Sequence, residues 1–158
     1  MIKLNEIYMD LAIKEANKNF KKLEGGPFGA CIIKEDQIIA IARNTVLRGD
    51  ATCHAEINAI RKASKKTKTF DLSGCVIYST TEPCPMCFSA IHWAKINIVV
   101  YGTTIFDAKK AGFNELTISS NRMKTLGNCS MEIYSKFKNE QCKKLLKKWT
   151  LLENKMVY

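Results

Sequence analysis

The sequence is organised around two short stretches, CHAE at residues 53–56 and PCPMC at residues 83–87. Together they supply one nitrogen ligand, His54, and two sulfur ligands, Cys84 and Cys87, of the kinds that zinc prefers. Three protein ligands leave the fourth tetrahedral position open, and an open position distinguishes a catalytic zinc site from a structural one. The two stretches therefore predict a catalytic zinc site.

Hydrolytic chemistry explains why these residue types occur together. Zinc lowers the pKa of a bound water from about 15.7 towards roughly 7, so that hydroxide is available at neutral pH. A carboxylate nearby can take the proton of that water and deliver it to a ring nitrogen and to a departing amine. Glu56 follows His54 by two residues, close enough to serve as this shuttle. Cys84 and Cys87 are one helical turn apart, so both sulfurs can face one metal, and Pro85 suits the first turn.

Other interpretations of the same residues remain open on the sequence alone. A C-x-x-C pair can be a redox motif. A fourth cysteine, Cys53 or Cys31, could close the zinc shell and make the site structural. The chain has only two histidines, His54 and His92, so a histidine-rich structural site is excluded.

Length and composition indicate one globular domain over residues 1–158. No apolar run reaches the ~20 residues that a membrane span needs, so no membrane partner is expected. Seven cysteines form an odd set, of which two are assigned to the metal, and this favours a reducing compartment, the cytoplasm.

The formal net charge of +10 is the one feature of the composition that points towards nucleic acid. Its basic residues fall on polar positions of expected helices, however, and solvated helix faces are the favoured explanation for them. A phosphate-binding surface is the alternative. The two clusters are Arg61, Lys62, Lys65, Lys66 and Lys68, and Lys136, Lys138, Lys143, Lys144, Lys147, Lys148 and Lys155.

Hydrophobic periodicity predicts alternating helices and strands. Helices are expected over 4–23, from about 53 onward, over 84–94 and over 142–152, and strands over 28–33, 37–42, 75–81, 96–101 and 131–137. The first two strands form a hairpin, and their nearly continuous apolar runs suggest cover on both faces. Asp50 or Thr52 is expected to cap the helix that carries His54. Residues 106–115 are expected to form a loop with a short helical turn, and 121–129 to be turn-like.

H-x-E followed by P-C-x-x-C is the signature of the zinc deaminases, which this chain resembles over about residues 4–112. The resemblance implies a cytidine-deaminase-like fold, a three-layer α-β-α sandwich around a mixed five-stranded sheet. It also implies one zinc ion per subunit, with Glu56 as proton shuttle rather than ligand.

Several strings resemble the bacterial guanine deaminases of this fold more than the tRNA adenosine deaminases. They are GGPFGA at 25–30, EPCPMC at 82–87, AIHWA at 90–94, FDAKKAGFNE at 106–115 and the terminal Tyr158. The resemblance implies hydrolysis of guanine, a small purine base, to xanthine and ammonia. It also implies a homodimer in which a C-terminal helical segment, residues 138–158, is open to exchange between subunits.

Individual roles follow from the same resemblance. It implies that Glu115, after an intervening Asn114, is a second proton shuttle. The further substrate contacts that it implies are the side chain of Asn44, the backbone N–H of Ala55, the rings of Phe28 and Trp93, and Tyr158. For the two rings, ordinary core packing is the alternative. A tRNA adenosine deaminase, another nucleobase or nucleoside deaminase, and a zinc-stabilised RNA-binding module without turnover are the remaining alternatives for the whole chain.

Overall fold

The computed structural model describes residues 3–158 and contains one mixed five-stranded sheet. The strand order is β2-β1-β3-β4-β5, with β1 antiparallel to both its neighbours and β3, β4 and β5 parallel. The strands are β1 (Gly29–Lys34), β2 (Gln37–Arg43), β3 (Cys75–Thr81), β4 (Ile98–Thr103) and β5 (Glu132–Tyr134). The predicted hairpin and the predicted mixed five-stranded sheet are therefore confirmed.

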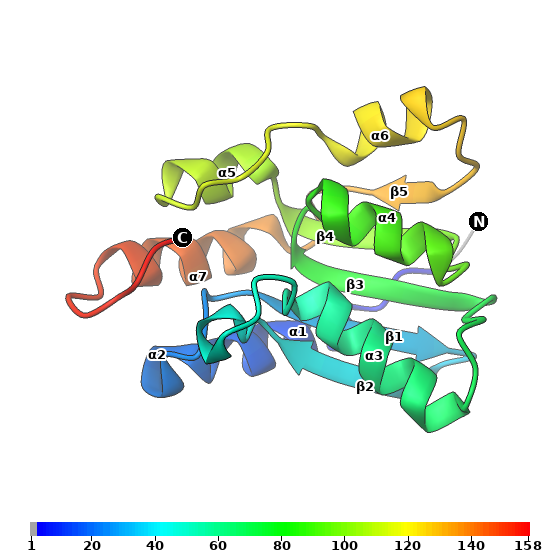
Figure 1. The fold of residues 1–158 in the computed structure, drawn as a ribbon, viewed down its shortest axis with the longest axis horizontal. Coiled ribbons are helices and arrows are strands. Elements are labelled where there is room, and N and C mark those ends of the chain that lie inside the picture. The colour runs from blue at the N-terminus through cyan, green and yellow to red at the C-terminus, as the bar shows by residue number, and fades with distance from the viewer. Residues whose placement is uncertain (1–2) are drawn as a thin grey trace.

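Helices cover both faces of this sheet, which gives the expected three layers. Figure 1 shows α3 and α4 on one face and α1 and α7 on the other, with α5 and α6 beyond the β4 side. The helices are α1 (Glu6–Asn17), α2 (Asn19–Lys22), α3 (Ala55–Thr67), α4 (Pro85–Trp93), α5 (Ile105–Lys110), α6 (Ser120–Leu126) and α7 (Asn139–Thr150), with a 3-10 turn at Val46–Arg48.

The central strand, β3, is buried along its whole length because helices lie over both of its faces. Its side chains alternate between two core clusters, as the two-residue period of a strand requires. Ile77 belongs to the core under α3 and α4, whereas Val76 and Tyr78 belong to the core under α1. The end of β3 leads directly into α4, so the rigid core positions both cysteines of the second motif.

Several local predictions were wrong. The segment 121–129, expected to be turn-like, contains α6, whose N-cap is Ser119, a side chain that accepts from the Arg122 N–H. The single helix expected over 4–23 is interrupted at Lys18, between α1 and α2. Both strands of the hairpin are covered on both faces, as predicted, because α1 and α3 pack on them, but β2 is an edge strand whose first residues are exposed.

The structure also bears on two predictions from length and composition, the expected lack of a membrane span and the extent of the domain. Within residues 3–158, none of the helices has the length and the apolar content required to span a membrane. The domain was predicted over residues 1–158, and residues 1 and 2 lie outside the described part of the chain.

Candidate active site

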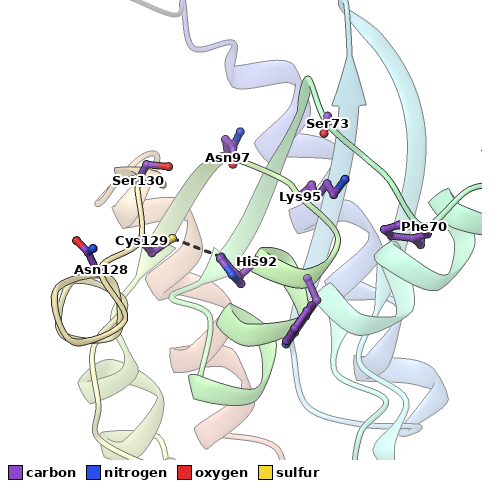
Figure 2. A pocket seen from close by; sticks show the side chains of 9 residues that line it. Phe70, Ser73, His92, Lys95, Asn97, Asn128, Cys129 and Ser130 are labelled. Atoms are coloured by element: carbon purple, nitrogen blue, oxygen red, sulfur yellow. Dashed lines mark hydrogen bonds between the residues drawn. The ribbon is translucent and has the colours of Figure 1, made fainter.

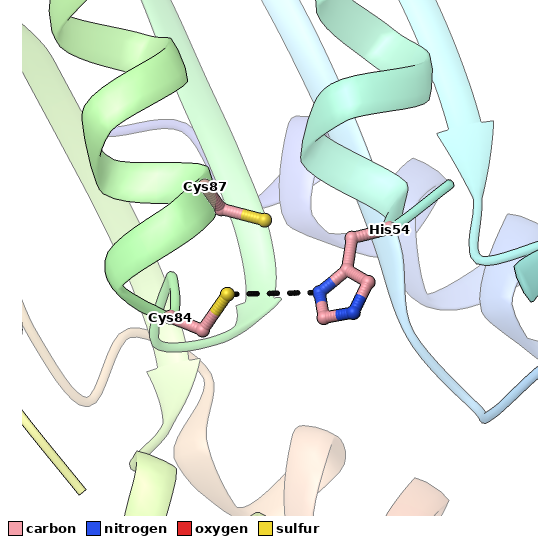
Figure 3. Close-up of side chains that lie close together, drawn as sticks. All are labelled: His54, Cys84 and Cys87. Carbon is pink, nitrogen blue, oxygen red and sulfur yellow. Dashed lines mark hydrogen bonds between the residues drawn. The ribbon is translucent and has the colours of Figure 1, made fainter. Parts of the chain in front are cut away.

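The three predicted zinc ligands converge from two helix N-termini. His54 is the N-cap residue of α3, Cys84 is the N-cap residue of α4, and Cys87 lies in the first turn of α4. Their ligand atoms all lie within 4.8 Å of one another, and His54 Nδ1 is 3.7 Å from Cys84 Sγ (Figure 3). Pro85 occupies the first turn of α4, as predicted, where its missing N–H breaks no helical bond.

The chemistry of this donor set fits zinc. Hydrogen bonds from Cys87 and His54 lower the pKa of the Cys84 thiol to about 4, so that one sulfur is a thiolate. Thiolate is the form in which cysteine binds metal. One imidazole nitrogen and two sulfurs in a compact triangle match the three-ligand set of catalytic zinc sites. Within residues 3–158 no other group of three metal-binding side chains lies this close together.

The structure removes the alternative in which a fourth cysteine closes the shell. The Cys53 thiol donates to Asp50 Oδ2 at 3.2 Å and also accepts from Arg61. Cys31 lies in the core cluster under α1, which is separate from the cluster that contains Cys84 and Cys87. The predicted cap of α3 was wrong as well, because Asp50 bonds the Thr52 N–H and hydroxyl instead of the helix N-terminus.

Glu56 lies in the first turn of α3 and is buried beside the ligands. Its Oε1 accepts a hydrogen bond of 2.9 Å from the Ser79 hydroxyl, and its Oε2 lies 3.5 Å from Cys87 Sγ. Burial raises the pKa of this carboxyl, so it can hold a proton more readily than an exposed glutamate. Ser79 was missed from the sequence, although it is a polar residue on the face of β3 that otherwise carries core side chains such as Ile77.

A second carboxylate reaches the same cluster. Glu115 lies in the segment between α5 and α6 and is half-buried. Burial raises its pKa to about 7, with a further contribution from the charge of Cys84, while His54 opposes the shift. The structure thus places two carboxyl groups of raised pKa around one set of metal ligands, an arrangement suited to proton transfer near neutral pH.

Asn44 presents an unused donor. Its side chain is buried, and its Oδ1 accepts from the Tyr158 hydroxyl at 2.7 Å and from the Val46 N–H at 3.1 Å. With Oδ1 fixed in this way, its Nδ2 has no hydrogen-bond partner within the described chain. Gly25 lies so close that a Cβ there would be 2.1 Å from Asn44 Oδ1. A buried amide donor without a partner indicates an acceptor supplied from outside the protein.

The terminal residue of the chain reaches the same place. The Tyr158 hydroxyl accepts from the Gly26 N–H at 2.8 Å, and its backbone oxygen accepts from the Asn114 N–H at 2.9 Å. Its ring meets Phe113 edge to face. These contacts bring together Asn44, Tyr158 and the segment that carries Glu115, which are far apart in the sequence.

Three predicted substrate contacts remain, and they lie in different parts of the structure. Ala55 is the first residue of α3, where a backbone N–H has no partner within the helix. Phe28 is buried and packs against Phe113 at 4.7 Å between ring centroids, next to Gly26. Trp93 lies at the opposite end of α4 from Cys84 and is 78% exposed. The structure therefore does not bring Trp93 to the zinc ligands.

Trp93 instead lines a surface cavity of about 510 Å³. Figure 2 shows this cavity, in which the Cys129 thiol lies 3.6 Å from His92 Nδ1. Its other lining residues are Phe70, Ser73, Lys95, Asn97, Asn128 and Ser130.

The fold and the site together define a zinc-dependent aminohydrolase. The model of the cytidine and deoxycytidylate deaminase zinc-binding region matches residues 2–103. This match spans more than half of the chain, and the chain belongs to that deaminase family.

Individual relatives agree with this assignment. The chain is 42% identical over 112 residues to the guanine deaminase of Bacillus subtilis, covering 70% of this chain and 72% of that protein. It is 40% identical over 108 residues to the tRNA-specific adenosine deaminase of Aquifex aeolicus, covering 68% and 70%. The solved structure of guanine deaminase from Nitrosomonas europaea superposes with a TM-score of 0.83 at 27% identity, covering 95% of this chain and 86% of that one.

The ligand assignment makes a direct prediction about metal content. Replacing Cys84 by alanine is expected to weaken zinc binding by more than the roughly 10–100-fold that loss of an outer-shell partner costs. Zinc per subunit, measured after dialysis against a chelator, should fall from one towards zero. Cys129→Ala is the matched control, because Cys129 lies in the other cavity, and it should keep its zinc. Stoichiometric zinc in Cys84→Ala under the same conditions would contradict the assignment.

Proposed function

We propose that the protein hydrolyses guanine to xanthine and ammonia. The observation that carries this proposal is that Tyr158 joins Asn44 to the segment of Glu115, a carboxyl group near enough to Cys84 and His54 for their charges to act on its pKa. Tyr158 holds Asn44 through its hydroxyl and the Asn114 N–H through its backbone oxygen, so the C-terminus lies on the side where a substrate would meet the unused Asn44 donor. The similarity to the Bacillus guanine deaminase supports the same substrate.

We assign the metal to His54, Cys84 and Cys87, one ion per subunit. When bound, zinc supplies a water-derived nucleophile at neutral pH. The Asn44 amide donates to an acceptor on the purine and orients the base, and the Ala55 N–H at the helix N-terminus donates to the substrate oxygen.

The two carboxyl groups move the protons. Glu56 accepts the Ser79 hydroxyl at Oε1. Its other oxygen, Oε2, takes a proton from the water and delivers it to the ring nitrogen beside the reacting carbon. Glu115 carries a proton near neutral pH because of its raised pKa and gives it to the departing amine. As the carbon–nitrogen bond breaks and the new C=O forms, the remaining hydroxyl proton of the added water passes to Glu115. Water and guanine thereby yield xanthine and ammonia, and both carboxyl groups return to their starting states. Phe28, which packs against Phe113, lines the space for the base.

The second candidate is a tRNA adenosine deaminase. The net charge of +10 and the Aquifex relative favour it. Two of the α3 lysines, however, are already engaged, because Lys62 and Lys66 donate to carbonyls of the edge strand β2, those of Ile41 and Ile38. The non-enzymatic RNA-binding module required either a filled zinc shell or an idle Glu56. The three-ligand set and the Ser79–Glu56 bond oppose it.

We further propose a cytoplasmic homodimer that acts in purine metabolism. The seven cysteines form no disulfide with one another, as a reducing compartment would leave them. We treat residues 1–158 as one domain, in which 138–158 is the segment open to exchange. Exchange between two subunits would preserve the Tyr158–Asn44 contact while moving it between chains. Mass measurement in solution would test the dimer.

Ammonia release from a panel of substrates tests the proposed function. The zinc-loaded protein should be incubated with guanine, guanosine, adenine, cytosine, cytidine and a tRNA anticodon stem-loop. Turnover of guanine alone is expected. Turnover of the RNA alone would replace guanine deaminase by the tRNA enzyme and make the two lysine clusters the binding surface. Turnover of another base or nucleoside would keep the deaminase assignment and replace guanine as the substrate.

Asn44→Asp tests the recognition of the base. Aspartate has the same shape and keeps an acceptor for Tyr158 and Val46, but it replaces the Nδ2 donor by an oxygen. We expect kcat/KM for guanine to fall roughly 10²-fold, the scale of a lost hydrogen bond to a buried group that also gains a charge. Asn121→Asp, on the exposed start of α6, is the matched control and should be neutral. Unchanged kcat/KM in Asn44→Asp would remove Asn44 from substrate recognition.

A further inference from the structure

Glu82 is a buried acidic residue with no role in the chemistry described above. It follows β3 directly, precedes Cys84 by two residues and is 5% exposed. Its backbone N–H donates to the Thr103 carbonyl at 2.8 Å, which ties it to the end of β4. Burial, together with the neighbouring Glu82 carboxylate, raises the pKa of Tyr101 to about 12. A charged group is rarely buried unless it is fully paired, so its partners identify its purpose.

Each carboxylate oxygen of Glu82 accepts a backbone N–H from a different helix. Oε2 accepts from Ile105 at 3.1 Å, and Oε1 accepts from Ser120 at 2.8 Å. These two residues are the first residues of α5 and α6, whose N–H groups have no partner within their helices. The Ser120 hydroxyl adds a bond of 3.3 Å to the Pro83 carbonyl. One side chain thus satisfies the N-termini of two helices.

The segment between these two anchors carries Glu115. Residues 111–119 contain no regular helix or strand. Within this stretch Phe113 is buried in the core, and the Asn114 N–H bonds the backbone oxygen of Tyr158. These contacts and the starts of α5 and α6, between which the segment lies, together set the position of Glu115 relative to the zinc ligands. Glu82 holds the start of α5, which precedes the segment, and the start of α6, which follows it, and it does so from the turn that carries Cys84.

We propose that Glu82 is a positioning residue that fixes the Glu115 segment relative to the zinc ligands. It acts through Glu115 and contacts no substrate, and this proposal rests on the proposed role of Glu115 in proton transfer. Proton transfer requires a closely defined distance between donor and acceptor, and a displacement of 1 Å can lower the rate about 10²-fold. Glutamine at this position keeps the size of the side chain but offers one acceptor where two N–H groups require two. One helix start is then released.

A double-mutant cycle in kcat tests this proposal with the best substrate of the panel. We expect Glu82→Gln to lower kcat by roughly 10–100-fold while KM and zinc content stay nearly constant. In a Glu115→Gln background the same change should cost less than about threefold, because the carboxyl that Glu82 positions is already gone. An equal loss in both backgrounds would reduce Glu82 to a general stabilising role and overturn the proposal. Full activity of Glu115→Gln alone would instead overturn the role of Glu115.

Two further measurements keep the result interpretable. If Glu82→Gln does not fold, Ser120→Ala removes the bond to Pro83 without touching the carboxylate and should show a smaller loss with the same dependence on Glu115. Hydrogen–deuterium exchange should rise in residues 111–119 of the Glu82 variant and stay unchanged in α1. Glu140→Gln, an exposed glutamate in the first turn of α7, is the control and should change neither rate nor exchange. A rise in exchange across the whole Glu82 variant, α1 included, would contradict a local positioning role.

Discussion

Glu56→Gln is expected to abolish measurable turnover while the protein keeps its fold and its zinc. The amide has the size of the carboxyl group and can still accept the Ser79 hydrogen bond, but it cannot take a proton from water. Proton transfer by a positioned side chain contributes up to about 10⁴-fold in rate. We expect kcat to fall by roughly 10³-fold or more, at the upper end of this range, because one carboxyl serves two transfers.

The measurement combines steady-state kinetics with zinc content and thermal unfolding of the same preparation. Glu140→Gln is a close control, since Glu140 and Glu56 both lie in the first turn of a helix. The control should retain full activity. Substantial turnover in Glu56→Gln would remove Glu56 as the shuttle, and loss of zinc would show instead that Glu56 supports the metal site.

The zinc ligands could be predicted from the sequence because local rules determine their geometry. Cys84, Pro85 and Cys87 lie within one helical turn, and the turn begins where a buried strand ends. His54 lies at the corresponding start of α3. Only the packing of two helices on one face of the sheet was needed to bring these groups together.

Other parts of the site depend on contacts between distant segments, which periodicity does not report. Ser79 is one residue in a buried strand, and its partner Glu56 lies 23 positions away. The role of Glu82 is recognisable only once the structure shows that α5 and α6 both begin at its carboxylate. Trp93 illustrates the opposite error, because its position in the AIHWA string suggests a substrate contact while the length of α4 carries it away from Cys84.

Glu115→Gln is expected to lower kcat by roughly 10²–10³-fold, again within the range for acid–base catalysis, with zinc content unchanged. The site holds this carboxyl at a pKa of about 7, whereas an exposed glutamate would be ionised there. A general acid must be protonated to act, so the rate falls as the pH rises through the pKa of that group. The wild-type rate should therefore fall on the alkaline side, and Glu115→Gln should lose that dependence.

The pH profile separates this role from simple damage to the site. A variant that merely distorts the zinc ligands would keep the shape of the profile and lower it uniformly. Glu115→Asp retains a carboxyl on a shorter arm and should recover part of the rate together with the alkaline limb. If Glu115→Gln instead keeps the wild-type rate, one carboxyl suffices for both proton transfers, and Glu56 must protonate the leaving amine as well as the ring.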